Sequence, residues 1–146
     1  MLVEKLLSRA RERLTIISDV APLIEAARLL RSGADIVVAC NKSGLVTGVI
    51  SKTDVVSQIS HCQGASCMAA AASVMTRDVV VCQPGDWLHD VWVVMKKRGL
   101  KNVPITVSDA RPVVVLTARD ALEALLGEVE NEEELLRDYV MSVGYR

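Results

Sequence analysis

The chain has 146 residues, 51% of them apolar, only 3% aromatic and none of them phenylalanine. A chain of this length can fold as one ordinary domain without metals or disulfides, with a core built from aliphatic side chains in layered sheets and helices. The formal net charge of −1 offers no basic surface for nucleic acid, which argues against nucleic acid as a partner.

The first segment, MLVEKLLSRARERL, carries charges throughout and has no unbroken apolar stretch. It lacks the pattern of a signal peptide, so we expect a cytoplasmic protein. The spacing predicts an N-terminal helix with Val3, Leu6 and Leu7 on one side and a solvated basic face. The longest uncharged run, 55–76, contains glutamines, a histidine and serines, so it predicts a connector and no membrane span.

The first half of the chain then shows a regular order of signals. A β-branched run at 15–17 predicts a strand, and Pro22 marks the turn after it. The segment LIEAARLL has helical spacing, with Gly33 as its expected stop. DIVVAC and LVTGVIS predict a hairpin around NKSG, and a short helix is expected to begin at Asp54.

The segment HCQGASC brings His61, Cys62 and Cys67 close together. Zinc sites usually need four ligands, with paired cysteines two to four residues apart, so this spacing favours reduced, packed thiols. Binding of a metal, or sensing through a thiol, stays open as a lesser alternative.

The second half repeats the order of the first. When Asp54 is laid over Asp120, Gly33 falls on Gly99 at the same offset of 66 residues. The repeat predicts a strand at 79–81, a helix over LHDVWVVM, a hairpin of KNVPIT and PVVVLT around SDAR, and a helix from Asp120.

The last segment predicts a separate C-terminal helix. Asn131 suits its N-cap, and Glu134 is the matching capping-box residue. One face carries the apolar side chains Leu135, Leu136, Tyr139 and Val140. We expect this face to dock on the chain's own body or on a second subunit. The chain thus divides into unit 1 with the N-terminal helix (1–62), a connector (63–76), unit 2 (77–128) and the C-terminal helix (129–146).

Both units carry the frame G-h-h-[ST]-x-x-D directly after the hairpin, where h is apolar. In unit 1 it is Gly48, Ser51 and Asp54; unit 2 keeps Thr117 and Asp120 but has valine in place of the glycine. The hydroxyl can donate to a phosphate oxygen, the carboxylate can accept from both hydroxyls of a ribose, and glycine permits close approach of a ligand. The alternative is that the same residues cap the following helix.

The strand, helix, strand, strand, helix order, written twice together with this frame, resembles the tandem CBS-domain family, also called the Bateman module, over roughly Leu14 to Leu126. The resemblance implies an α/β (α+β) fold of two β-α-β-β-α units packed about a pseudo-twofold axis, with extra N- and C-terminal helices. It also implies clefts for adenosyl ligands such as AMP, ADP, ATP, S-adenosylmethionine or NAD(H), and no obligatory cofactor.

The family takes phosphate donors from the start of the second strand of each unit. Unit 2 offers Lys101 and Asn102 there, whereas unit 1 offers Asp35 and Ile36, which do not suit an anion. The two clefts are therefore expected to be unequal. Arg119 is a further phosphate candidate or, equally, a solvated arginine. The full set of expected contacts is Leu14, Thr15, Gly48, Ser51, Asp54, Val79, Val80, Lys101, Asn102, Thr117, Arg119 and Asp120.

These observations predict a regulatory module that senses an adenosyl ligand, works as a homodimer and is read by an effector protein. The sequence has no G-x-x-x-x-G-K-[ST], G-x-G-x-x-G or H-E-x-x-H motif, which argues against an enzyme. The alternatives are a structural dimerisation module with vestigial clefts, a nucleotide-processing enzyme, and a thiol or metal sensor.

Overall fold

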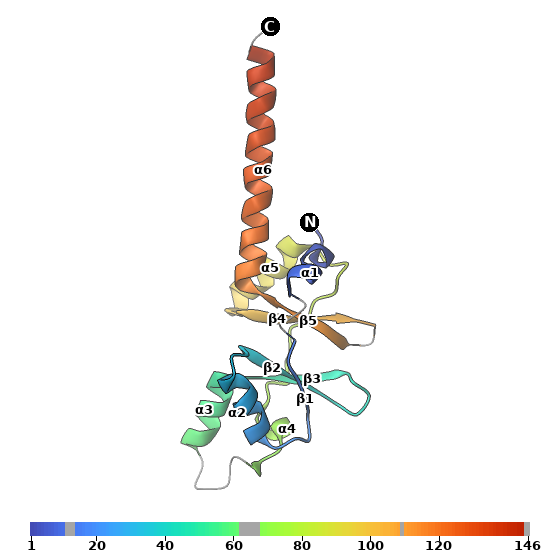
Figure 1. Cartoon of the computed structure of the whole chain (residues 1–146), viewed down its shortest axis with the longest axis vertical. Helices are drawn as coiled ribbons and strands as arrows, with labels where there is room; N and C mark the ends of the chain where they lie inside the picture. The colour runs from blue at the N-terminus through green and yellow to red at the C-terminus, as the bar shows by residue number, and fades with distance from the viewer. Residues whose placement is uncertain (11–13, 62–67, 109, 145–146) are drawn as a thin grey trace.

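The computed structural model describes residues 1–10, 14–61, 68–108 and 110–144. The first half contains the 3-10 helix η1 (Val3–Leu6), α1 (Leu7–Ala10), β1 (Ile16–Ser18), α2 (Leu23–Arg31), β2 (Ile36–Cys40), β3 (Val46–Ser51) and α3 (Lys52–Ser60). The second half contains α4 (Ala71–Val74), α5 (Leu88–Arg98), β4 (Asn102–Val107), β5 (Arg111–Thr117) and α6 (Ala118–Gly144). Figure 1 shows two sheets facing each other, with the helices on their outer sides.

The sheet of unit 1 has the strand order β1-β2-β3, with β1 parallel and β3 antiparallel to β2. The helix α2 covers it, and Leu23, Ala26 and Leu30 form a core with strand residues such as Val37 and Ile50. The hairpin and the glycine stop of α2 are as the sequence predicts.

The prediction of a first strand in unit 2, at 79–81, is wrong. The described part of unit 2 has a two-stranded sheet of β4 and β5. Only an isolated parallel bridge joins Cys82 to Ile105, where the Cys82 amide donates to the Pro104 carbonyl at 3.0 Å. The reason is that segment 76–82 crosses between the sheets. Thr76 pairs with Val49 of β3 at one end and Cys82 pairs with β4 at the other, so the residues between them have no strand alongside.

The two sheets meet in a small core of their own. Val38 and Cys40 of β2 are buried there with Val115 of β5, and Leu14 packs against them. The Val46 amide of one hairpin donates to the Ala110 carbonyl of the other at 2.9 Å. The α/β architecture of two units is thus confirmed. In the part of the chain that the structure describes, no helix is long and apolar enough to cross a membrane.

The C-terminal helix differs from the prediction in two respects. One continuous helix, α6, runs from Ala118 to Gly144, so Asn131 lies inside it and is not an N-cap. Docking of its apolar face on the chain's own body is also wrong. The residues of that face, Leu135, Leu136, Tyr139 and Val140, are 59–67% exposed. The helix projects away from both units (Figure 1).

Candidate ligand-binding site

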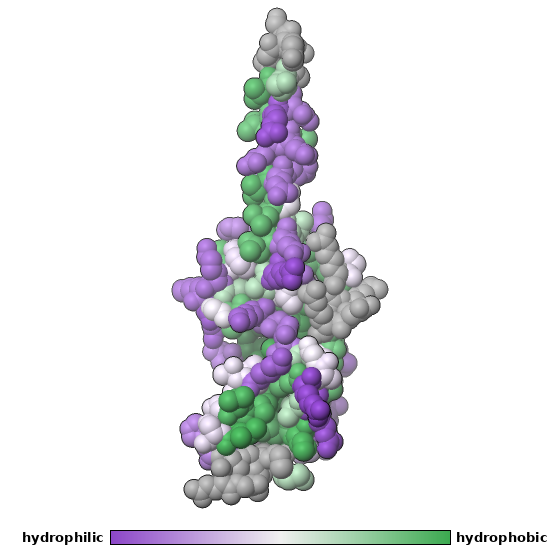
Figure 2. Space-filling model, turned by 60° about the vertical axis from the view of Figure 1, so that its left-hand side comes forward, coloured by the Kyte–Doolittle hydropathy of each residue, from purple (hydrophilic) through white to green (hydrophobic). Residues whose placement is uncertain are grey.

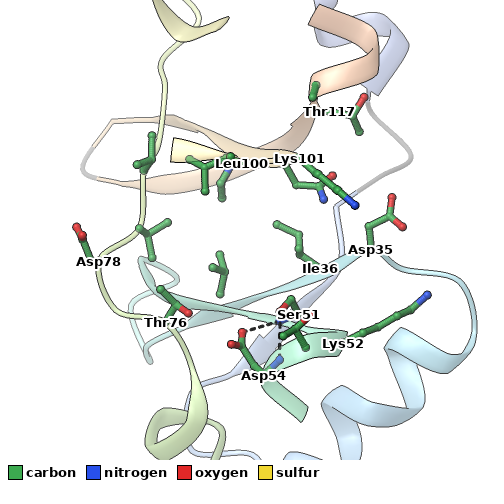
Figure 3. A pocket seen from close by; sticks show the side chains of 18 of the residues that line it. Asp35, Ile36, Ser51, Lys52, Asp54, Thr76, Asp78, Leu100, Lys101 and Thr117 are labelled. Atoms are coloured by element: carbon green, nitrogen blue, oxygen red, sulfur yellow. Dashed lines mark hydrogen bonds between the residues drawn. The ribbon is translucent and has the colours of Figure 1, made fainter. Parts of the chain in front are cut away.

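A cavity of about 790 Å³ lies between the two sheets and takes its walls from both units. Figure 3 shows side chains entering it from the unit 1 sheet on one side and the unit 2 sheet on the other. The crossing segment 76–82 closes one flank with Thr76, Asp78, Val79 and Val80. The sequence-predicted residues that line this cavity are Ser51, Asp54, Val79, Val80, Lys101, Asn102, Thr117 and Arg119.

Ser51 and Asp54 form a reciprocal cap at the start of α3. The Ser51 amide donates to Asp54 Oδ2 at 2.9 Å, and the Asp54 amide donates to Ser51 Oγ at 3.3 Å (Figure 3). The capping interpretation of the frame is therefore realised in unit 1. Both side chains also line the cavity, so the cap holds them at its wall.

The two hairpins have the same strand register at the start of their first strand. Ile36 lies opposite Ser51 in unit 1, and Asn102 lies opposite Thr117 in unit 2. The Lys101 carbonyl accepts a hydrogen bond from the Ala118 amide at 2.8 Å, which fixes the start of β4 against the start of α6.

The cavity brings together predicted site residues from both units. Lys101 of unit 2 lines the same cavity as Ser51 and Asp54 of unit 1, and Figure 3 shows its side chain extending from the unit 2 sheet toward the gap. Alignment of the repeat could not reveal this pairing, because it depends on how the two sheets face each other.

The cavity contains charges of both signs. Lys52, Lys101 and Arg119 bring positive charge, and Asp35, Asp54 and Asp78 bring negative charge. Our sequence reasoning missed Lys52 and Asp78 as site residues. Lys52 could have been found, since it follows Ser51 directly inside the frame, whereas no motif marks Asp78.

Arg119 has a partner outside the cavity. Its side chain is 86% exposed, and Nε donates to Glu123 Oε1 at 3.2 Å. This arrangement fits the alternative of a solvated arginine in the first helical turn. Asp78 is likewise paired, with Arg98 Nη2 at 2.8 Å from its Oδ2. Of the cations at the cavity wall, Lys101 and Lys52 make no ion pair with another described residue, so they are the cations best placed to receive an anion.

The aspartate of the unit 2 frame is buried, whereas Asp54 of unit 1 is half-buried. Asp120 is only 7% exposed, and its amide donates to Thr117 Oγ1 at 3.1 Å. A second cavity, of about 350 Å³, is lined by Thr117 and Asn102 together with Thr15 and Asp35 of unit 1. Asp120 is absent from the lining of both cavities.

Leu14 and Gly48 also lie outside the walls of both cavities. Leu14 is half-buried in the core between the sheets. Gly48 is buried, and a side chain at this position would overlap Met75, which is itself 7% exposed. The close approach that glycine permits here is therefore made by Met75 of the chain itself.

Of the candidate metal cluster, Cys62 and Cys67 lie outside the described residues. His61 is described, and its Nδ1 lies 2.7 Å from the Ser57 carbonyl oxygen. No group of three or more metal-binding side chains occurs among the residues that the structure describes. Cys40 and Cys82 are buried free thiols, and burial raises the pKa of Cys82 to about 12.

Comparison with known proteins gives the same fold. The CBS-domain containing protein ATU1752 of Agrobacterium tumefaciens is 23% identical, with a TM-score of 0.72 over 84% of this chain and 97% of that one. The CBS domain pair of protein MJ0100, solved with 5′-methylthioadenosine and S-adenosyl-L-methionine, is 19% identical, with a TM-score of 0.70 over 88% and 97%. CBSX2, solved with AMP, is 17% identical, with a TM-score of 0.71 over 86% and 96%.

The family model of the CBS domain matches the sequence twice, at residues 3–61 and 71–127. These two matches correspond to the two units of the fold and cover most of the chain. The protein therefore belongs to the CBS domain family and contains two CBS domains in tandem.

Proposed function

We propose that this protein is a regulatory module, not an enzyme, that binds an adenosyl ligand in the 790 Å³ cavity between its sheets. One observation carries the proposal: the cavity joins the hydroxyl and carboxylate of Ser51 and Asp54 in unit 1 to the cation Lys101 of unit 2. Two CBS-domain pairs of similar fold, solved with AMP and with S-adenosyl-L-methionine, support the ligand class.

The ribose end of the ligand fits the carboxylate of Asp54. An ionised carboxylate has two oxygens and about four acceptor sites, and the cap to the Ser51 amide uses Oδ2. The remaining capacity suits the two hydroxyls of a ribose. The cap also holds the carboxylate in one position before the ligand arrives, which lowers the cost of ordering it on binding.

The other parts of the ligand fit the remaining walls. An adenine ring can lie against apolar side chains, and those at the cavity are Ile36, Val49, Val79, Val80, Leu100 and Pro104. Lys101 and Lys52 can each place an ammonium group near a phosphate or a carboxylate. Asn102 adds an amide donor beside Lys101.

Binding of a ligand in this cavity would be coupled to the placement of one unit relative to the other. It contacts unit 1 and unit 2 at once, so it favours whichever relative placement brings both sets of contacts within reach. A ligand shifts such an equilibrium only by its differential affinity for the two states. The output is therefore a change in module shape that an effector protein in the cytoplasm reads.

Mass spectrometry of ligands released from freshly purified protein tests the proposal. We expect an adenosyl compound in the parent extract and little or none from the double variant Asp54→Ala/Lys101→Met, prepared in parallel. An equal amount of adenosyl compound in both extracts would contradict this site. If neither protein carries one and neither binds one when it is added, the structural dimerisation module becomes the better account.

A further inference from the structure

Only the first part of α6 packs against the body of the protein. At its start, Ala121 and Ala124 are buried in the core of unit 2, and the N-terminal amine pairs with Glu128 at 3.2 Å. From Val129 to Met141 every residue is exposed. An unsupported helix of this length is marginal in water and normally depends on packing of an apolar face. The projecting half of α6 therefore needs a partner that packs against its apolar face.

Five of the exposed apolar residues of α6 follow a spacing of four and three that is interrupted only at Glu133. Leu122, Val129 and Leu136 lie seven residues apart, and Leu126 and Val140 each follow one of them by four. These five side chains are 41–63% exposed. Figure 2 shows apolar atoms along one side of the projecting helix and hydrophilic atoms along the other. A repeat of seven residues is the signature of a left-handed coiled coil.

We name these positions the α6 seam: Leu122, Val129 and Leu136 at position d, and Leu126, Glu133 and Val140 at position a of the heptad. Glu133 is the one charged residue among them. In a parallel pair position a of one helix meets position a of the other, so the two Glu133 carboxylates would face each other and lower the stability of the dimer.

The charges beside the α6 seam fit a second copy of the chain in parallel orientation. Glu132 occupies position g and Arg137 position e of the next heptad. In a parallel pair, position g of one helix meets that position e of the other. Twofold symmetry then makes the contact between Glu132 and Arg137 twice. An antiparallel pair would instead bring position g against position g, and so place Glu132 beside the Glu132 of the second copy.

We propose that α6 from two copies of this protein forms a parallel two-stranded coiled coil along the α6 seam. The seam from Leu122 to Val140 is ~28 Å long at 1.5 Å per residue. It begins on the body of unit 2, so the two bodies lie side by side at one end of the pair. The proposal does not depend on the adenosyl ligand, because the seam contains none of the residues that line the cavity.

Sedimentation equilibrium of the full chain over a range of concentrations tests the pairing. The parent should be a dimer. Leu136→Lys should raise the dimer dissociation constant roughly tenfold or more, since burial of a leucine is worth about 1.5–3 kcal/mol. Leu135→Lys is the matched control: Leu135 is 62% and Leu136 63% exposed, but Leu135 lies outside the seam. A monomeric parent, or an equal effect of both variants, would overturn the proposal.

Replacement of Glu133 should strengthen the dimer, and unfolding of the variant cannot produce this effect. Glu133→Leu removes the charge from the seam and should tighten the dimer by about tenfold. Weaker or unchanged association would overturn the placement of Glu133 at position a.

A charge exchange tests the parallel orientation. Glu132→Arg and Arg137→Glu should each weaken the dimer, and the double variant should recover most of the loss. Residues five apart do not face each other on one helix, so recovery reports contact between copies. Losses that simply add in the double variant would overturn the parallel pairing.

Discussion

Replacement of Asp54 by alanine removes one observed and one proposed interaction of the same carboxylate. The first is the hydrogen bond from the Ser51 amide to Asp54 Oδ2, 2.9 Å long, which belongs to the cap of α3. Loss of such a cap costs about 1 kcal/mol of stability. The second is the proposed contact with the ribose. Hydrogen bonds to a charged group contribute about 1.5–3 kcal/mol, so the affinity for an adenosyl ligand should fall roughly 10- to 150-fold.

Two further variants separate the cap from the ligand contact. Asp54→Glu keeps the capping box, since glutamate is the usual residue at this position, but it moves the carboxylate by one methylene. Ser51→Ala removes the hydroxyl that caps the Asp54 amide at 3.3 Å and leaves the carboxylate in place. Urea denaturation measures the loss of the helix cap, and titration calorimetry with an adenosyl ligand measures the loss of the ribose contact. If Asp54→Ala loses stability and binds like the parent, the carboxylate is only a helix cap and the ribose argument is refuted.

Three other changes each test one contact of the structure or of the proposed ligand. Lys101→Met keeps the apolar stem, so the affinity lost should grow from adenosine to AMP to ATP and shrink in high salt; an equal loss for all three ligands would place the phosphates elsewhere. Gly48→Ala forces a methyl group into the buried side chain of Met75 and should cost about 1–3 kcal/mol in urea denaturation, with partial rescue by Met75→Ala; an unchanged midpoint would count against this contact. Burial raises the pKa of Cys82 from 9.0 to about 12, so the unfolded chain loses this proton at a lower pH than the folded protein does. The free energy of unfolding should therefore fall as the pH rises above 9.0, and Cys82→Ala should reduce this dependence on pH. The same pH dependence in both proteins would exclude Cys82 as its cause.

The sequence was informative where local chemistry decides the structure. Gly99 ends α5 in the left-handed conformation at a φ of 65°, as its place after an amphipathic run predicts. Ser51 and Asp54 form the cap that their spacing allows. The repeat of the frame at Thr117 and Asp120 also predicts the equivalent strand registers of the two units. In each case the determining residues lie within one helix end or one hairpin.

The predictions failed where distant residues decide. Val79 to Val81 have high strand propensity, but they cross between the sheets and lack a strand alongside. Asn131 is a good N-cap in isolation, yet the helix continues through it because Gly127 costs only about 1 kcal/mol and its neighbours favour helix. The sharing of one cavity by Asp54 and Lys101 follows from sheet packing, which no local pattern encodes.

Isothermal titration calorimetry of the parent protein with AMP, ATP, S-adenosylmethionine and NADH tests the central claim most directly. The account predicts saturable binding of at least one of these compounds by the folded protein, with the double variant Asp54→Ala/Lys101→Met losing it while it keeps the parent's far-UV circular dichroism. The account is contradicted if the folded parent binds none of the four, or if the double variant binds as tightly as the parent.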